Sequence, residues 1–133
     1  MKKRRKTNKL NPNSVYWKSR ADNAWVKAPG ADVCEICRAI GTVNTTNQIH
    51  NHHLIGRTNL KYRHNLQNRI RLCANHHNGN YGDISAHGDL RQVDNFKEWL
   101  RIFKPTQYQW WLDHKDDKRQ PEETYEEAYE RLK

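Results

Sequence analysis

The chain has 133 residues, of which only 35% are hydrophobic. It contains 24 Lys or Arg and 15 Asp or Glu residues, which give a formal net charge of +9. A chain of this length is expected to form one domain with tails, and its sparse apolar content predicts a thin core that needs a metal or disulfides for stability. Its three cysteines cannot all pair with one another. No apolar run follows the basic N-terminus, which argues against a signal peptide or a membrane span. We therefore expect a cytoplasmic protein whose reduced thiols bind a metal.

The positive charge is concentrated at the N-terminus, because residues 1–20 include no Asp or Glu. A basic segment of this kind favours a polyanionic partner, and nucleic acid is a more common partner than a membrane. We predict that residues 1–13 form a flexible basic arm and that this arm contacts the phosphates of DNA. The arm residues assigned to these contacts are Lys2, Lys3, Arg4 and Arg5.

The first predicted helix covers residues 14–28, where Ser14 can cap the N-terminus and a Pro-Gly pair follows the last turn. The stretch VCEIC comes next and is expected to form a turn that brings its two cysteines together. Residues 48–56, QIHNHHLIG, alternate weakly between apolar and polar and indicate a strand. Residues 58–69 are polar and basic and form either a long loop or a partly helical segment. A short apolar stretch then leads through Cys73 into a predicted helix.

Two further helices are predicted in the C-terminal third of the chain. Phe96, Trp99, Leu100 and Phe103 recur at the spacing of one helical face, and Pro105 is expected to end that helix. Residues 122–133, which are rich in Glu, are expected to form another helix that DNA would repel. The predicted organisation is a basic arm over residues 1–13, a zinc-stabilised core over residues 14–88 and a helical extension over residues 89–133.

The cysteine and histidine spacing predicts a structural zinc site. Tetrahedral zinc is commonly held by two short-spaced pairs of Cys or His ligands that are far apart in the sequence. Cys34 and Cys37 form the first pair, and Cys73 begins the second. A two-residue spacer after Cys73 selects His76 as the fourth ligand, and the neighbouring His77 is left for another role.

His77 belongs to a second group of histidines. It lies one residue beyond His76, and on a helix its side chain is turned by about 100° from that of His76. Upstream, His52 and His53 are adjacent, and on a regular strand they point to opposite faces. Geometry alone therefore leaves open which of them faces His77. No special role is expected for the other histidines, which are His50, His64, His87 and His114.

The pattern CEIC…NHHLIGR…NLQNRIRLCANHH resembles the HNH endonuclease family, in particular small phage-type members with a cysteine-bound zinc. The match covers residues 34–80, and His76 stands where the family usually has a cysteine. The resemblance implies an α+β fold with a small ββα-metal (His-Me finger) core, stabilised by a structural zinc and flanked by helices. It also implies one catalytic divalent cation, Mg²⁺ or another ion.

Site roles follow from the resemblance residue by residue. His53 is implied to be the general base that deprotonates water, and His52 and His77 are implied to be ligands of the catalytic cation. Asn68 would hold the loop and orient His53, and Arg57 would contact the phosphate. A neutral imidazole suits a general base near pH 7. In addition, Arg63 and Arg69 are predicted to contact the DNA backbone.

The function predicted from these features is a metal-dependent DNA endonuclease that hydrolyses phosphodiester bonds. The main alternative is a zinc-knuckle module that binds DNA without catalysis, and a third hypothesis is an RNA-binding or structural protein of a phage or ribosome-like assembly. The surplus histidines favour the endonuclease over both. Besides DNA, the partners considered are a second copy of the chain and a phage packaging or recombination protein. A phage-encoded chain would act in the host cytoplasm.

Overall fold

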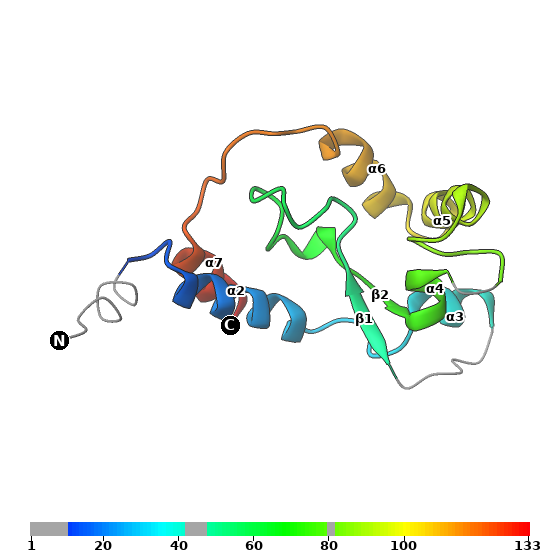
Figure 1. Cartoon of the computed structure of the whole chain (residues 1–133), viewed down its shortest axis with the longest axis horizontal. Coiled ribbons are helices and arrows are strands. Elements are labelled where there is room, and N and C mark those ends of the chain that lie inside the picture. The colour runs from blue at the N-terminus through cyan, green and yellow to red at the C-terminus, as the bar shows by residue number, and fades with distance from the viewer. Residues whose placement is uncertain (1–10, 42–47, 80–81) are drawn as a thin grey trace. The chain divides into compact units, whose positions relative to one another are not determined.

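The computed structural model describes residues 11–41, 48–79 and 82–133 (Figure 1). These residues form six α-helices, one 3₁₀ turn and two strands, so the α+β class is confirmed. The elements are α2 (Val15–Lys27), α3 (Glu35–Ile40), β1 (Ile49–His52), η1 (Leu66–Asn68), β2 (Ile70–Cys73), α4 (Ala74–Asn78), α5 (Leu90–Phe103), α6 (Pro105–His114) and α7 (Tyr125–Leu132). None of the described helices is long and apolar enough to cross a membrane.

The chain folds as two compact units, and both are assembled from segments that are far apart in the sequence. Of the described residues, the first unit contains 11–29, 57–66 and 118–133, and the second contains 30–41, 48–56, 67–79 and 82–117. Part of the loop between the strands, residues 57–66, groups with α2 and α7 in the first unit, and the division into arm, core and extension stays a prediction. The predicted DNA contacts at Lys2, Lys3, Arg4 and Arg5 lie outside the described residues.

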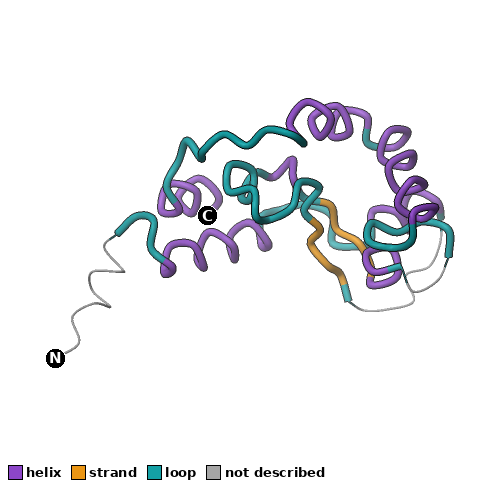
Figure 2. The backbone as a smooth tube through the Cα atoms, turned by 45° about the horizontal axis from the view of Figure 1, so that its top comes forward, coloured by secondary structure: helices purple, strands orange, loops and turns teal. Residues whose placement is uncertain are grey.

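An antiparallel hairpin forms the centre of the second unit. β1 pairs with β2 in a register that sets Ile49 opposite Cys73 and His52 opposite Ile70, and α4 follows β2 without a linker (Figure 2). Ile70 and Leu72 alternate along β2 and point into the core, where both are fully buried. The hairpin therefore presents the zinc-site cysteine at one end and His52 at the other.

Helices α3 and α5 complete the core of this unit. Ile36 of α3 and the predicted face of α5, which buries Phe96, Trp99 and Leu100, pack against the residues of β2. Phe103, the fourth residue of that face, remains half exposed. Pro105 follows the end of α5 as predicted, and it also occupies the first position of α6, where its missing N–H costs no hydrogen bond.

The first unit is built on the packing of α2 against α7. The predicted cap of α2 is confirmed, because the Ser14 hydroxyl accepts a hydrogen bond from the backbone N–H of Trp17. Residues 11–13, which were assigned to the flexible arm, are held by α7: the backbone N–H of Glu126 donates to the Pro12 carbonyl at 2.9 Å, and that of Tyr125 donates to Asn13 Oδ1 at 3.3 Å. Residues 12 and 13 thus have backbone and side-chain contacts with the start of α7, and the flexible arm stays a prediction.

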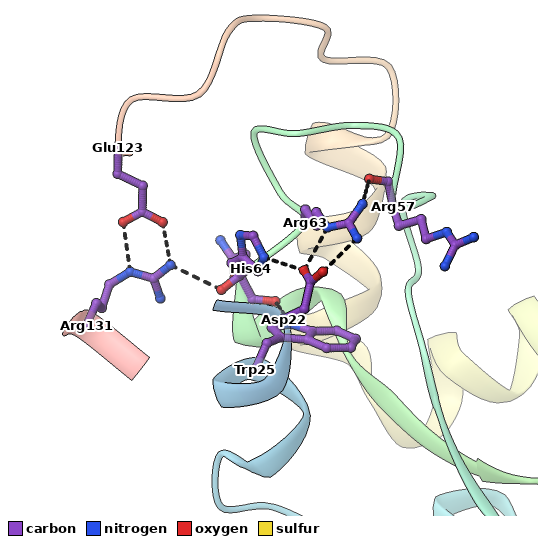
Figure 3. Close-up of polar contacts among 8 residues, drawn as sticks. Asp22, Trp25, Arg57, Arg63, His64, Glu123 and Arg131 are labelled. Carbon is purple, nitrogen blue, oxygen red and sulfur yellow. Dashed lines mark hydrogen bonds and ion pairs between the residues drawn. The ribbon is translucent and has the colours of Figure 1, made fainter. Parts of the chain in front are cut away.

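A partly buried polar network joins the inter-strand loop to α2 (Figure 3). Asp22 accepts two hydrogen bonds from the Arg63 guanidinium, at 2.8 and 2.9 Å, and one from His64 Nε2 at 2.7 Å. Burial raises the pKa of Asp22, but the bonds from Arg63 and His64 outweigh it and hold the pKa below its usual value. Burial also keeps the pKa of His64 below its usual value in spite of Asp22, so the imidazole is neutral and donates its Nε2 proton.

The same loop is also tied to the C-terminal segment. Arg131 donates to the Glu123 carboxylate and to the His64 carbonyl, the latter at 3.1 Å. On the α2 side, the Trp25 indole N–H donates to the Asn65 carbonyl at 3.0 Å. The loop between the two strands is thus fixed by side chains of both helices of the first unit.

We predict that Asp22→Asn destabilises the first unit by about 1–2 kcal/mol, because Arg63 and the buried His64 lose a charged acceptor while the exposed part of Asp22 remains screened by water. Urea unfolding at pH 7 measures this loss. The matched control is Asp116→Asn, since the ion pair of Asp116 with Lys115 is at the surface, and its cost is expected to stay below about 0.5 kcal/mol. Equal midpoints for the two variants would contradict the structural role of Asp22.

Candidate metal centres

Three thiols converge on one imidazole nitrogen in the second unit. The Sγ atoms of Cys34, Cys37 and Cys73 lie 3.4, 3.4 and 3.3 Å from Nδ1 of His76, and the Sγ atoms of Cys37 and Cys73 are 3.9 Å apart. All four side chains are buried. A single imidazole nitrogen offers either one proton or one lone pair, so hydrogen bonds cannot account for three sulfur neighbours at once.

A tetrahedral zinc ion accounts for these distances. Bonds of about 2.3 Å to sulfur and about 2.0–2.1 Å to nitrogen would place S···N pairs about 3.6 Å apart and S···S pairs about 3.8 Å apart. The four donor atoms lie close to these separations, and each residue offers one ligand atom within 4.8 Å of the others. The predicted set of Cys34, Cys37, Cys73 and His76 is therefore brought together as a Cys₃His group suited to structural Zn²⁺.

Local structure explains how the four ligands converge. Cys34 is the N-cap of α3 and accepts a hydrogen bond from the Cys37 backbone N–H at 3.5 Å. Cys73 is the N-cap of α4, so that His76 comes back toward it after one turn. Burial raises the pKa of Cys34, but hydrogen bonds from His76 and from the backbone of Cys37 and Cys73 outweigh it and lower the pKa to about 6. The site thus favours the thiolate that zinc binds.

A second cluster begins one residue further along α4. His52 of β1, His77 of α4 and His87 each place a ring nitrogen within 4.8 Å of the others. The ring centroids are 5.2 Å apart for His52 and His77, 4.8 Å for His52 and His87, and 4.9 Å for His77 and His87. The predicted pair of His52 and His77 therefore faces one space, and His87 completes a group that can hold a metal ion.

His87, for which the sequence predicts no special role, lies in this cluster because of its backbone. Two backbone hydrogen bonds align its segment with α4: the N–H of Ala86 donates to the His76 carbonyl at 2.8 Å, and the N–H of His87 donates to the His77 carbonyl at 3.0 Å. The backbones touch where two glycines meet, since a Cβ on Gly79 would lie 2.4 Å from Gly88 Cα. Gly79 also has a φ of +73°, which ends α4 in a left-handed turn.

His50 is likewise placed in this neighbourhood, against expectation. Its Nδ1 lies 2.8 Å from Nδ1 of His77, and one of the two rings must donate the proton of this hydrogen bond. The bond occupies Nδ1 of His77 and leaves its Nε2 available to a metal. No spacing rule links His50 and His87 to the motif. The one sequence signal for the close approach of the His87 segment to α4 is the set of glycines that includes Gly79 and Gly88.

Burial and the neighbouring histidines lower the pKa values of two members of this cluster, His52 and His77. Burial, followed by the neighbouring His87, His77 and His53, lowers the pKa of His52 to about 3. Burial, followed by His87 and His50, lowers the pKa of His77 to about 4. Imidazoles bind metals in the neutral form, so both nitrogens are available for coordination at neutral pH.

His53 lies just after the first strand of the hairpin, and Asn68 lies shortly before the second strand. His53 is the first residue after β1 and is half-buried. Asn68 is fully buried in η1: its side-chain oxygen accepts from the Ile55 backbone N–H at 2.6 Å, and its side-chain amide donates to the Ile55 carbonyl at 2.9 Å. Asn68 therefore fixes the backbone two residues after His53, and the orientation of His53 by Asn68 stays a prediction.

The three predicted phosphate-binding arginines have different surroundings. Arg57 is exposed and lies in the first unit, where its carbonyl accepts from Arg63 at 3.1 Å. Arg63 itself is committed to Asp22 and is mostly buried, an arrangement that leaves little of its guanidinium for DNA. Arg69 is half-buried against the backbone of Gly30, and burial and Arg71 lower its pKa. Phosphate contact stays a prediction for all three.

No protein-family model matches the chain, and the comparisons with curated proteins and with solved structures also find no match. The resemblance to HNH endonucleases therefore rests on the motifs alone.

We predict one tightly bound zinc per chain and its loss in Cys73→Ser and His76→Ala. Structural zinc contributes about 10–16 kcal/mol in small peptides, which exceeds the net stability of about 5–15 kcal/mol of a typical domain. Both variants should therefore lose the cooperative thermal unfolding of the second unit, whereas His114→Ala should keep one zinc and its melting temperature. Elemental analysis and calorimetry measure both quantities. Full thermal stability of zinc-free protein would refute a structural metal.

We further predict that His52 and His77 remain neutral down to about pH 5 in protein that holds only the structural zinc. In the unfolded chain these imidazoles bind protons near pH 6.5. The unfolded state thus takes up protons first, so the free energy of unfolding falls as the pH drops below about 6.5 and levels off only below the folded pKa values. A ¹³C-edited NMR titration of the histidine rings checks this prediction. Midpoints near 6.5 for both rings would contradict it.

Proposed function

We propose that the protein is a metal-dependent DNA endonuclease that hydrolyses phosphodiester bonds. The observation that carries the proposal is that two adjacent histidines of α4 belong to different clusters. His76 lies with the three thiols, and His77 lies with His52 and His87. A zinc-stabilised binding module requires the first group and has no use for the second. The positive net charge of +9 supports a nucleic acid as the substrate.

The order of elements also supports the proposal. A hairpin followed directly by a helix, with His52 at the end of the first strand, Asn68 before the second strand and His77 on the helix, is the arrangement implied by the likeness to ββα-metal nucleases. A buried Asn that holds the inter-strand loop fits the same arrangement.

The catalytic cation is proposed to bind His52, His77 and His87. Three imidazole ligands suit zinc, nickel or another transition ion, whereas Mg²⁺ prefers oxygen ligands and keeps its waters. Three protein ligands are also typical of catalytic sites, which keep a position open. When bound, such an ion supplies charge stabilisation to the scissile phosphate and to the leaving oxygen.

Side chains of the protein are proposed to activate the attacking water and to hold the phosphate. His53 follows directly after the ligand His52, and we propose that its imidazole takes a proton from the attacking water. Asn68 keeps the backbone after His53 in place through Ile55. Arg57 is proposed to contact a phosphate of the bound strand.

The alternative is a zinc-knuckle module that binds DNA without cutting it. The Cys₃His group and the positive charge suit this function equally well. It leaves unexplained why two glycines bring His87 to within metal-ligand distance of His52 and His77.

We predict that the protein cuts a supercoiled plasmid in the presence of Mn²⁺, Ni²⁺, Co²⁺ or Zn²⁺, and more weakly with Mg²⁺. His53→Ala should lower the cleavage rate at least 100-fold, because a general base usually contributes a factor of about 10²–10⁴. His53→Ala should keep its zinc and its DNA affinity. His114→Ala is the matched control and should cut at the wild-type rate.

Two outcomes would count against this proposal. Equal cutting by His53→Ala and wild type would reject His53 as the base. DNA binding without cutting under every cation tested would favour the zinc-knuckle module instead.

A further inference from the structure

The first unit contains a groove between α2 and α7, with a volume of about 440 Å³. A helical stripe of α2 forms one wall and the last turn of α7 forms the other. The lining residues that bear on its chemistry are Arg20, Asn23, Lys27, Tyr129, Leu132 and Lys133. The volume is within the range of about 300–1,000 Å³ that is usual for ligand sites in proteins.

Every charged side chain that lines this groove is a cation. Three other cations of the same unit are neutralised, because Arg63 pairs with Asp22, Lys61 with Glu122 and Arg131 with Glu123. Among the described residues, Arg20 and Lys27 form no ion pair with a carboxylate. The groove therefore brings two uncompensated positive charges to one concave surface.

The acidic helix α7 contributes no carboxylate to the groove. Two of its glutamates have partners: Glu127 forms a capping box with Thr124, and Glu130 pairs at 2.7 Å with Lys133, which compensates the charge of that lining lysine. The groove face of α7 instead presents Tyr129, Leu132 and Lys133.

Ring contacts hold the Arg20 side chain within the groove. Its guanidinium carbon lies 4.5 Å from the ring centroid of Tyr16 and 5.9 Å from that of Tyr129. A guanidinium that lies against aromatic rings keeps its N–H donors free at the edge, where they can fork onto two oxygens of one phosphate. Lys27 and the Asn23 amide add donors further along the same face of α2.

The spacing of the cations fits a DNA strand. Arg20 and Lys27 are seven residues apart on α2, which corresponds to about 10 Å along the helix. One DNA strand advances by about 3.4 Å per phosphate, so this distance spans about three nucleotide steps. Tyr129 and Leu132 offer an apolar floor on which the sugars can rest.

We propose that the groove between α2 and α7 binds the phosphodiester backbone of DNA, as a contact surface made of residues other than those of the metal centres. The choice of DNA rests on the proposed function, and the basic charge of the groove stands independently of it. Arg20 and Lys27 each contact a phosphate and displace its counterions.

The test compares Arg20→Gln/Lys27→Gln with Arg91→Gln/Arg101→Gln. Both double variants remove two positive charges, and Arg91 and Arg101 are exposed residues of the second unit that pair with Asp83 and Glu98. Affinity for a fluorescent 20-base-pair duplex is measured from 50 to 200 mM salt without added divalent cations, so that no cleavage occurs. Circular dichroism confirms the fold of each variant.

The groove variant is expected to lower the slope of log affinity against log salt by about 1.8, since each phosphate contact on duplex DNA contributes about 0.9. Wild-type affinity should therefore fall about tenfold more than that of the groove variant over this salt range. The control variant should keep the wild-type slope. Equal slopes for the two variants, or a wild-type protein that does not bind the duplex, would overturn the proposal.

The groove and the endonuclease can fail separately. If the wild-type protein never cuts the plasmid but Arg20→Gln/Lys27→Gln has a lower salt slope than wild type, the groove proposal is supported and the endonuclease proposal is rejected. A protein that cuts the plasmid while the groove variant keeps the wild-type slope rejects the groove and keeps the endonuclease.

Discussion

The convergence of three thiols on Nδ1 of His76 is the constraint on which the second unit depends. The ligands come from α3, the end of β2 and α4, so a single ion at this point fixes the relation of three elements. The surrounding core is small and consists largely of Ile36, Ile70, Leu72 and three residues of α5. A core of this size buries little apolar surface, and a metal bound by the Cys₃His group would contribute the stability that such a core lacks.

The same constraint positions the second cluster. α4 has only five residues, and a free helix of that length does not persist in water. Its conformation is therefore imposed by Cys73 and His76 at its start and by Gly79 at its end. His77 inherits its direction from this arrangement, because a rotation of about 100° separates it from a residue that is fixed. A structural ion and a proposed catalytic ion are thus linked through one peptide bond.

Sequence reasoning was most successful where a spacing encodes the chemistry. The pairs Cys34 with Cys37 and Cys73 with His76 identified the thiol group because short spacings on a turn and on a helix leave few alternatives. The cap at Ser14 and the face of α5 followed from local rules in the same way. His87 was missed because it reaches the cluster through backbone pairing between segments, and such pairing leaves no periodicity in the sequence. The grouping of the inter-strand loop with α2 and α7 depends on Asp22 and Arg63, which are 41 residues apart. No periodicity or spacing in the sequence predicts an ion pair between residues so far apart.

The meeting of Gly79 with Gly88 has a consequence for how sites of this kind are recognised and altered. Neither position offers a functional group, yet a methyl group at Gly79 would collide with the opposite backbone and separate the two segments. If His52, His77 and His87 hold an ion, the number of nitrogen ligands available to it is thus governed by a glycine that cannot coordinate anything. A substitution at Gly79 would then leave a two-nitrogen site without changing a histidine, and open a position for water, a ligand that suits harder ions.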